Sequence, residues 1–145
     1  MILIVCLDDK KGRMFNHRRQ SRDQAVTEEI QKICMGKKLW MSPYSDRLYG
    51  SLKGMELTVN PDFLSLAGSG EFCLAESEGL AAYEESIEQI IVFWWNRTYP
   101  ADVYLDLDLS RWERKERYEF PGTSHEKITE CSLGKSKKIE KHLLM

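Results

Sequence analysis

Two short, almost wholly apolar segments constrain the fold of this chain more than any other feature. They are ILIVCL at residues 2–7 and QIIVFWW at residues 89–95. A run that is apolar at nearly every position, and rich in β-branched residues, predicts a strand that is covered on both faces. Such strands lie inside sheets that carry helices on both sides. The two segments therefore predict neighbouring central strands of an α/β domain.

The segments around these runs alternate between strand and helix patterns. A capping-box pattern runs from Ser21 to Gln24 and predicts a helix that begins at Ser21 and ends at Gly36. Its apolar positions recur at helical spacing: Val26, Ile30, Ile33 and Cys34. Further strands are expected at residues 37–42, 55–60, 70–77 and 102–109, and further helices at 42–50, 61–68 and 79–88. Residues 113–133 predict two antiparallel strands joined by a turn at 121–124.

Length and charge limit the classes of function. With 145 residues, we expect a single domain at 1–134, followed by a Lys-rich, solvated tail at 135–145. The chain has 21 basic and 23 acidic residues, so extended binding to nucleic acid or to a membrane surface is not expected. Any anion site must be local. The sequence does not indicate an oligomeric state.

The cysteines and the N-terminus predict the compartment. Cys6, Cys34, Cys73 and Cys131 are widely spaced, with no pair at zinc-ligand spacing, so we expect free thiols in a reducing environment and no metal site. The apolar segment at residues 1–7 is too short for a signal sequence or a membrane span. A cytoplasmic location is therefore expected.

Four basic side chains lie at or just before the start of the first predicted helix: His17, Arg18, Arg19 and Arg22. A helix N-terminus attracts anions, and arginine binds phosphate or carboxylate through two donors at once. This arrangement predicts an anion-receiving loop. The alternative is that these are solvated charges that pair with nearby acidic residues.

Other polar residues follow predicted strands and are candidates for ligand contacts. Tyr44 and Ser45 come after the second strand, and Arg97 comes after the apolar run at 89–95, where it could hold a phosphate. Asp23 is interpreted as a residue that stabilises the helix end rather than as a general acid, because nearby arginines lower the pKa of a carboxyl group. His125 is interpreted as a surface residue of the turn.

The order of these segments resembles dihydrofolate reductase. MILIVCLDDKKGRMFN is similar to that family's first strand and the loop after it, SRDQAVTEEI to its substrate-site helix, and GKKLWMSPYSDRLY to its second strand and cofactor-side helix. WERKERYEF and HEKITECSL are similar to its C-terminal hairpin. The resemblance implies a three-layer α/β sandwich with a mixed, mainly parallel sheet and an antiparallel C-terminal hairpin.

Three departures from that family's pattern bear on function. The helix carboxylate that assists the family's chemistry falls on Gln24, with Asp23 one residue early. The cofactor-side helix keeps only a hydroxyl, at Ser45. The family's paired glycines, which allow close approach to a pyrophosphate, are expected within FWWNR, where Trp94 and Trp95 are bulky. We therefore expect no cofactor and no reductase chemistry.

The stretches VCLDD, FNHRRQSRD and SHEKIT also resemble a small bacterial family whose members often carry the label ribonuclease Z. The residues and these two resemblances leave three functions open, the third of them implied only by the family label. The first is the binding of a small phosphate-bearing or nucleotide-like ligand by a divergent dihydrofolate reductase-like protein. The second is a divergent NADPH-dependent oxidoreductase, and the third is an RNA-processing hydrolase. The residues expected to contact the ligand are His17, Arg18, Arg19, Arg22, Tyr44, Ser45 and Arg97.

Overall fold

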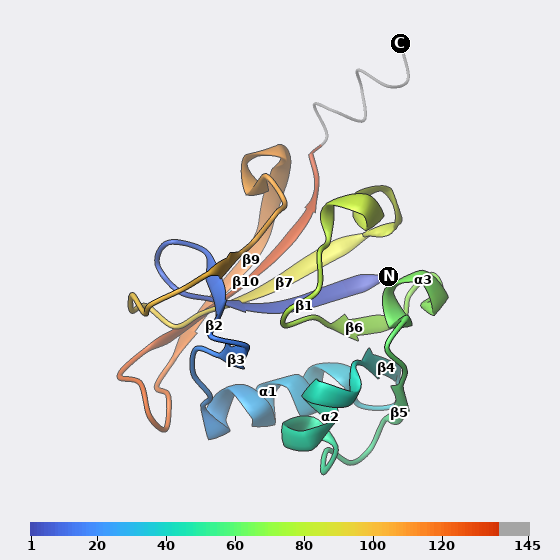
Figure 1. Ribbon diagram of the computed structural model, residues 1–145, viewed down its shortest axis with the longest axis horizontal. Coiled ribbons are helices and arrows are strands. Elements are labelled where there is room, and N and C mark those ends of the chain that lie inside the picture. The colour runs from blue at the N-terminus through green and yellow to red at the C-terminus, as the bar shows by residue number, and fades with distance from the viewer. Residues whose placement is uncertain (137–145) are drawn as a thin grey trace.

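A seven-stranded sheet forms the centre of the computed structural model, which describes residues 1–136 (Figure 1). The strands lie in the order β5-β4-β6-β1-β7-β10-β9. Their bounds are β1 Ile2–Leu7, β4 Lys38–Met41, β5 Glu56–Val59, β6 Phe72–Leu74, β7 Gln89–Trp94, β9 Trp112–Phe120 and β10 Ile128–Lys135. The first five strands in this order are mutually parallel. β10 is antiparallel to both of its neighbours, β7 and β9. The expected mixed, mainly parallel sheet with a C-terminal hairpin is confirmed.

The two apolar runs lie side by side, as predicted. They form β1 and β7, which pair in parallel with Ile4 opposite Ile91. Alternate residues of β1 enter different cores. Leu3 and Val5 pack in one core, and Ile4 packs in the other. Burial on both faces explains why both runs are apolar apart from Gln89 at the start of β7.

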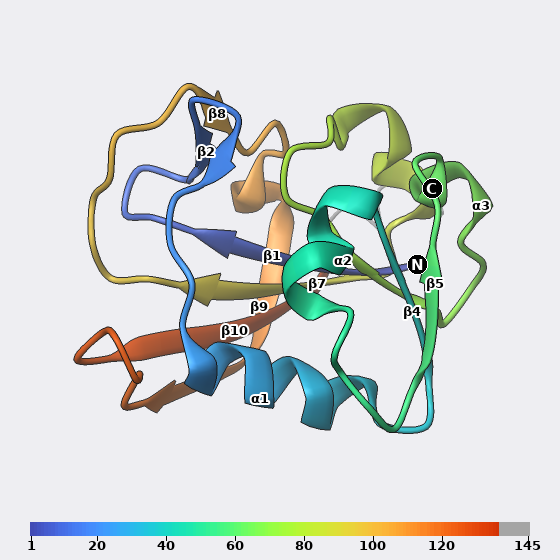
Figure 2. The same cartoon turned by 60° about the horizontal axis from the view of Figure 1, so that its bottom comes forward.

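Helices cover both faces of the sheet (Figure 2). α1 (Gln24–Cys34) and α2 (Pro43–Tyr49) pack on the face that Ile4 enters. α3 (Phe63–Leu66) packs on the opposite face, where residues next to the 3₁₀ helix η1 (Ala81–Ser86) are also buried. None of the helices within residues 1–136 has the length and apolar character needed to span a membrane.

A second, small sheet lies beside the first and has the order β3-β2-β8. It consists of β2 (Gly12–Phe15), β3 (Arg18–Arg19) and β8 (Val103–Tyr104). The strand predicted at 102–109 is therefore wrong beyond Tyr104. Its carboxylates turn to backbone donors instead: Asp106 accepts from the N–H groups of Leu80 and Ala81, and Asp108 caps the 3₁₀ helix η2 (Leu109–Arg111).

Two predicted helix starts had different outcomes. α2 has Ser42 as its N-cap and Pro43 at its first position, as predicted, and the Ser42 hydroxyl accepts from Ser45 N–H at 3.1 Å. The predicted start of α1 at Ser21 is wrong. Asp23 is the N-cap, and its carboxylate accepts from the N–H of Ala25 at 2.9 Å. The segment predicted as helical at 79–88 forms η1 rather than an α-helix.

All four cysteines are free, as expected, and three of them are buried. The predicted tail at 135–145 overlaps the last residue of β10, Lys135, and its residues 137–145 lie outside the described part of the chain.

A buried carboxyl group on β10 makes the stability of the fold depend on pH. Glu130 is 8% exposed, and its Oε1 atom has no hydrogen-bond partner. Burial, the charge and hydrogen bond of Glu29 and the charge of Glu116 together raise the pKa of Glu130 from 4.5 to about 7. The folded state therefore binds a proton that the unfolded chain has already lost, so stability falls as pH rises from about 4.5 to about 7.

We expect Glu130→Gln to raise the melting temperature at pH 8, because the variant has no carboxylate to bury. The difference from the unmodified protein should shrink at pH 5, which thermal unfolding at the two pH values would measure. Glu56→Gln, at an exposed position on β5, is the matched control and should change neither value. A lower melting temperature for Glu130→Gln at pH 8 would contradict this account.

Candidate functional site

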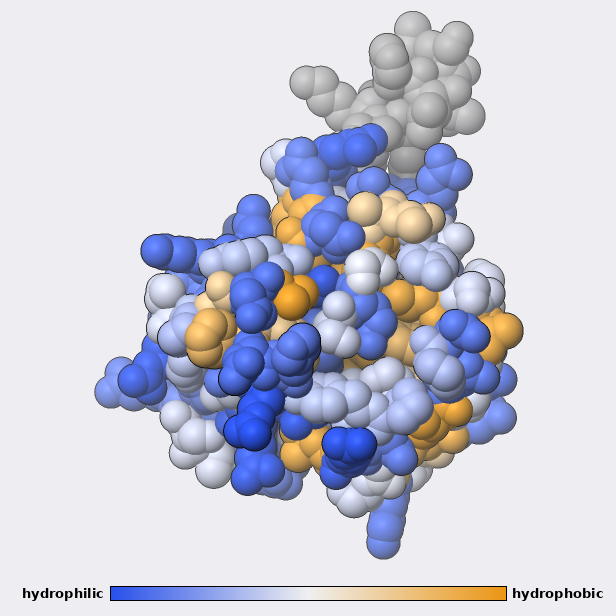
Figure 3. All heavy atoms as spheres, viewed as in Figure 1, coloured by the Kyte–Doolittle hydropathy of each residue, from blue (hydrophilic) through white to orange (hydrophobic). Residues whose placement is uncertain are grey.

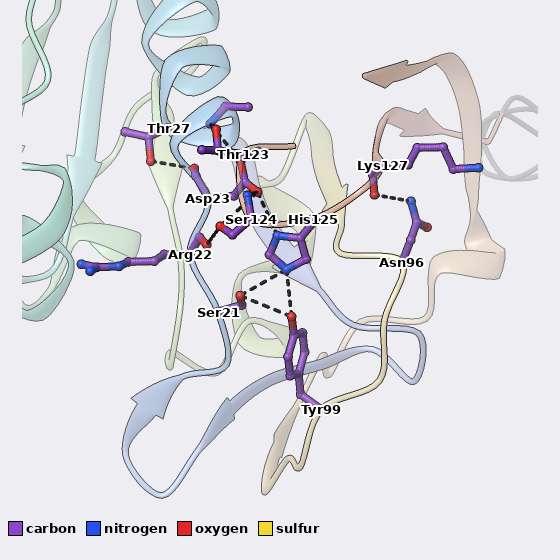
Figure 4. Close-up of polar contacts among 11 residues, drawn as sticks. Ser21, Arg22, Asp23, Thr27, Asn96, Tyr99, Thr123, Ser124, His125 and Lys127 are labelled. Atoms are coloured by element: carbon purple, nitrogen blue, oxygen red, sulfur yellow. Dashed lines mark hydrogen bonds and ion pairs between the residues drawn. The ribbon is translucent and has the colours of Figure 1, made fainter. Parts of the chain in front are cut away.

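The carboxylate of Asp23 joins the start of α1 to the hairpin turn between β9 and β10 (Figure 4). Its Oδ1 atom accepts from the N–H of Ala25 and from the N–H of Thr123, both at 2.9 Å. Its Oδ2 atom accepts from Ser124 N–H at 2.8 Å and lies 2.9 Å from His125 Nδ1. The Asp23 side chain is fully buried. One carboxylate thus satisfies donors that are about a hundred positions apart in the sequence.

His125 continues this network on the other side of its ring. Its Nε2 atom lies 2.8 Å from the Tyr99 hydroxyl and 3.2 Å from the Ser21 hydroxyl (Figure 4). The ring stacks on Trp95 with centroids 4.7 Å apart. The interpretation of His125 as a surface residue is therefore wrong, because its side chain is only 3% exposed. The turn folds back onto α1, and this buries the His125 side chain.

The environment of Asp23 keeps it ionised. Burial alone would raise the pKa of this carboxyl group, but the N–H groups of Thr123, Ser124 and Ala25 and the His125 ring outweigh burial, so the pKa lies well below its usual range. An ionised carboxylate can only accept hydrogen bonds, so Nδ1 of His125 carries a proton. The interpretation of Asp23 as a helix-end residue agrees with its position as the N-cap.

A second polar cluster lies at the carboxyl ends of β4, β6 and β1. Arg19 donates to both carboxylate oxygens of Glu76, at 2.8 and 2.9 Å. Ser45 Oγ donates to Glu76 at 2.8 Å, and the Arg19 guanidinium lies 4.6 Å from the centre of the Tyr44 ring. The structure thus brings together three predicted ligand residues, Arg19, Tyr44 and Ser45. In this arrangement they surround the protein's own carboxylate.

The space left beside this cluster is small. The cavity has a volume of about 10 Å³, and its walls include Cys6, Arg13, Ser21, Glu76 and Trp95. A cavity of this size holds about one water molecule or one oxygen atom.

Arg13 is a residue of this cavity that sequence reasoning missed. It is 5% exposed, and its Nε and Nη1 atoms have no partner, although Nη2 donates to the carbonyl of Glu78 at 2.8 Å. Burial lowers the pKa of Arg13, despite the opposing charges of Asp106 and Glu78. No spacing pattern marks this residue, because it comes from β2, in a segment that was expected to be a loop.

The other predicted ligand residues lie apart from this cluster. His17 and Arg18 are exposed at the connection between β2 and β3. Arg22 lines a cavity of about 380 Å³, together with Thr123 and Ser124.

Arg97 lines the largest of these cavities, with a volume of about 650 Å³. Its walls are Trp95, Asn96, Arg97, Ser124, His125, Glu126 and Lys127. Within the described part of the chain, no group of three or more His, Cys, Asp or Glu residues could hold a metal ion.

Comparison with solved structures identifies the fold. Dihydrofolate reductase from Enterococcus faecalis, complexed with NADP(H) and RAB-propyl, aligns with a TM-score of 0.66 and 9% sequence identity. The alignment covers 94% of this chain and 96% of that chain. This protein has a dihydrofolate reductase-like fold. No protein-family model and no curated protein matches the sequence.

We expect Asp23→Asn to lower the free energy of unfolding by about 3 kcal/mol, because the amide can accept at only one atom and leaves buried donors unpaired. Since the pKa of Asp23 is lowered in the folded state, its contribution is complete above the ordinary carboxyl pKa of about 4 and is lost as pH falls below it. Urea unfolding at pH 7 and pH 3 should show a smaller difference between variant and unmodified protein at pH 3 than at pH 7, because the loss begins below about pH 4 and is still incomplete at pH 3.

Asp62→Asn is the matched control. Asp62 also stands at a helix N-cap but makes no side-chain cap hydrogen bond. It should leave the free energy of unfolding nearly unchanged at both pH values. Equal effects of the two substitutions at pH 7 would show that Asp23 has no special role.

Proposed function

We propose that this protein binds a small phosphate-bearing or nucleotide-like ligand and performs no reductase chemistry. The observation that carries the proposal is the cavity of about 650 Å³ that contains Arg97 and Lys127. Its volume is within the usual range for small-molecule sites. It lies where β7 ends and β10 begins, which is the carboxyl edge of the parallel strands. Open α/β sheets bind their ligands at this edge.

The lining of the cavity suits an anion. Arg97 and Lys127 supply cationic donors, against one acidic residue, Glu126. The Arg97 guanidinium is exposed and lies 5.7 Å from the centre of the Tyr99 ring. Trp95 and His125, whose rings stack on each other and are buried, also line the cavity. The phosphate of a ligand would bind at the two cations.

The packing around Glu76 supports the absence of reductase chemistry. The crevice between the ends of β1 and β6 has room for about one oxygen atom, since Arg19 and Glu76 occupy it. The pair is half-buried, with side-chain exposures of 20% and 11%. A dinucleotide or pteridine ring would have to displace this ion pair. His17, Arg18 and Arg22 are proposed as outer contacts, where exposed cations attract an anionic ligand before it binds.

We expect Arg97→Ala to weaken binding of adenosine monophosphate roughly tenfold, as the loss of one charge-assisted contact implies. Calorimetric titration would measure the dissociation constant, and adenosine should bind the two proteins equally weakly. Arg114→Ala removes the same charge from an exposed position on β9 outside the cavity, and should not change the affinity. Equal affinities of Arg97→Ala and Arg114→Ala for adenosine monophosphate would refute the site.

Titration with NADPH tests the absence of reductase chemistry. We expect weak or no binding, because Arg19 and Glu76 fill the crevice at the ends of β1 and β6. Glu76→Ala, which releases Arg19 and removes bulk, should increase any affinity for NADPH. Binding at low micromolar concentration to the unmodified protein would overturn the proposal in favour of a divergent oxidoreductase.

A further inference from the structure

We infer that Ser21, His125 and Asp23 form a hydrolytic site in which Ser21 is the nucleophile and the substrate is a carboxylic ester. The three side chains make a continuous chain of contacts. Asp23 Oδ2 lies 2.9 Å from His125 Nδ1, and His125 Nε2 lies 3.2 Å from Ser21 Oγ. A nucleophile bonded to a base, and a base oriented by a third group, is the arrangement that activates a serine. The inference shares His125 and Trp95 with the walls of the cavity at Arg97 but does not depend on a ligand there, so either proposal can fail alone.

The orientation of the imidazole supports the role of His125 as a general base. Asp23 is a buried acceptor, so Nδ1 carries a proton and the lone pair of the neutral ring is at Nε2. The backbone N–H groups of Thr123 and Ser124 hold the carboxylate in place. Trp95 stacks on the ring and prevents it from turning. Nε2 is therefore fixed on the side where Ser21 lies (Figure 4).

A small cavity beside Ser21 has the size and the donors of an oxyanion hole. Ser21 and Arg13 both line the cavity of about 10 Å³, which has room for about one oxygen atom. Arg13 is only 5% exposed, and two of its guanidinium nitrogens have no hydrogen-bond partner. Glu76 also lines the cavity, but Arg19 and Ser45 already donate to its carboxylate. Fixed donors at a developing negative charge lower the barrier of acyl transfer.

The chemical step is that of an ester hydrolase. Ser21 Oγ attacks the carbonyl carbon and transfers its proton to His125 Nε2, and the carbonyl electrons move to the oxygen beside Arg13. The carbonyl re-forms, the bond to the alcohol oxygen breaks, and His125 returns the proton to the leaving alcohol. Water then attacks the acyl-serine in the same way. The products are one carboxylic acid and one alcohol, with Ser21 regenerated.

Tyr99 competes with Ser21 for the base. Its hydroxyl is 2.8 Å from His125 Nε2, which is closer than Ser21, and it also lies 3.4 Å from Ser21 Oγ. The single lone pair at Nε2 can accept only one of the two protons well. While Tyr99 donates to Nε2, Ser21 is not activated. Removal of the Tyr99 hydroxyl should therefore increase the reactivity of Ser21.

The test uses a fluorophosphonate probe, which phosphonylates activated serines, with mass spectrometry to locate the adduct. We expect one adduct on Ser21, no adduct in Ser21→Ala, and at least tenfold slower labelling in His125→Gln. Tyr99→Phe should be labelled several-fold faster. Hydrolysis of p-nitrophenyl acetate should follow the same order. Ser110→Ala is the matched control, because the Ser110 hydroxyl bonds to the carboxylate of Asp108 instead of a histidine.

Ser21→Ala should fold normally, since α1 begins at Gln24 and its cap is Asp23, and this variant keeps the test valid if His125→Gln does not fold. Three results would overturn the inference. They are no labelling of the unmodified protein, labelling of Ser21 that His125→Gln leaves unchanged in a folded protein, and an adduct on Tyr99. Slower labelling of Ser21 in Tyr99→Phe would equally contradict the competition between the two hydroxyls.

Discussion

One buried carboxylate organises the edge of this molecule where its candidate sites lie. Asp23 accepts from Ala25 at the start of α1 and from Thr123 and Ser124 in the turn before β10. Helix N-termini and tight turns both leave N–H groups unpaired, and each such group is costly when buried. A neutral side chain could not satisfy so many donors. The arrangement of His125 and of the cavities beside it depends on this contact.

Carboxylates have the same role elsewhere along this edge. Asp8 accepts from the N–H groups of Lys10, Gly12 and Tyr99, and Asp106 accepts from those of Leu80 and Ala81. These acidic residues hold loops in place, Asp8 from a buried position and Asp106 from an exposed one. The face of the molecule in Figure 3 is mainly hydrophilic, and its hydrophobic residues form separate patches. Although the total charge is close to neutral, individual carboxylates are therefore placed where backbone N–H groups of the loops need acceptors.

The sequence predicts the layers of this fold better than it predicts the contacts at its edge. The apolar runs at 2–7 and 89–95 locate the central strands, because burial on both faces requires an unbroken apolar pattern. Ser42 and Pro43 locate the start of α2 for an equally local reason. In contrast, the partners of Asp23 lie about a hundred positions away, and no pattern near Asp23 or His125 reports that distance.

The anion-site prediction shows the same limit. The basic residues at 17–22 stand out in the sequence, but their side chains point in different directions in the structure. Arg19 points inward and pairs with Glu76, whereas Arg18 and Arg22 are exposed. Successive residues of β3 point to opposite sides, and Glu76 attracts Arg19 to the inner side. Glu76 follows β6, which is distant in the sequence from β3. Arg13 has no distinguishing neighbour in sequence, although it is the most deeply buried cation of the edge.

His125 connects the two proposed sites physically. One face of its ring stacks on Trp95 beside the cavity of Arg97, while its Nε2 edge lies near Ser21 and Tyr99. A ligand in this cavity that displaced His125 would change the distance from Nε2 to Ser21 relative to the distance to Tyr99. The distance from Nε2 is 2.8 Å to the Tyr99 hydroxyl and 3.2 Å to the Ser21 hydroxyl. Because these two distances are similar, a small shift would change which hydroxyl donates to Nε2. Any such coupling must be reciprocal, so a group attached to Ser21 would in turn alter the affinity of the cavity.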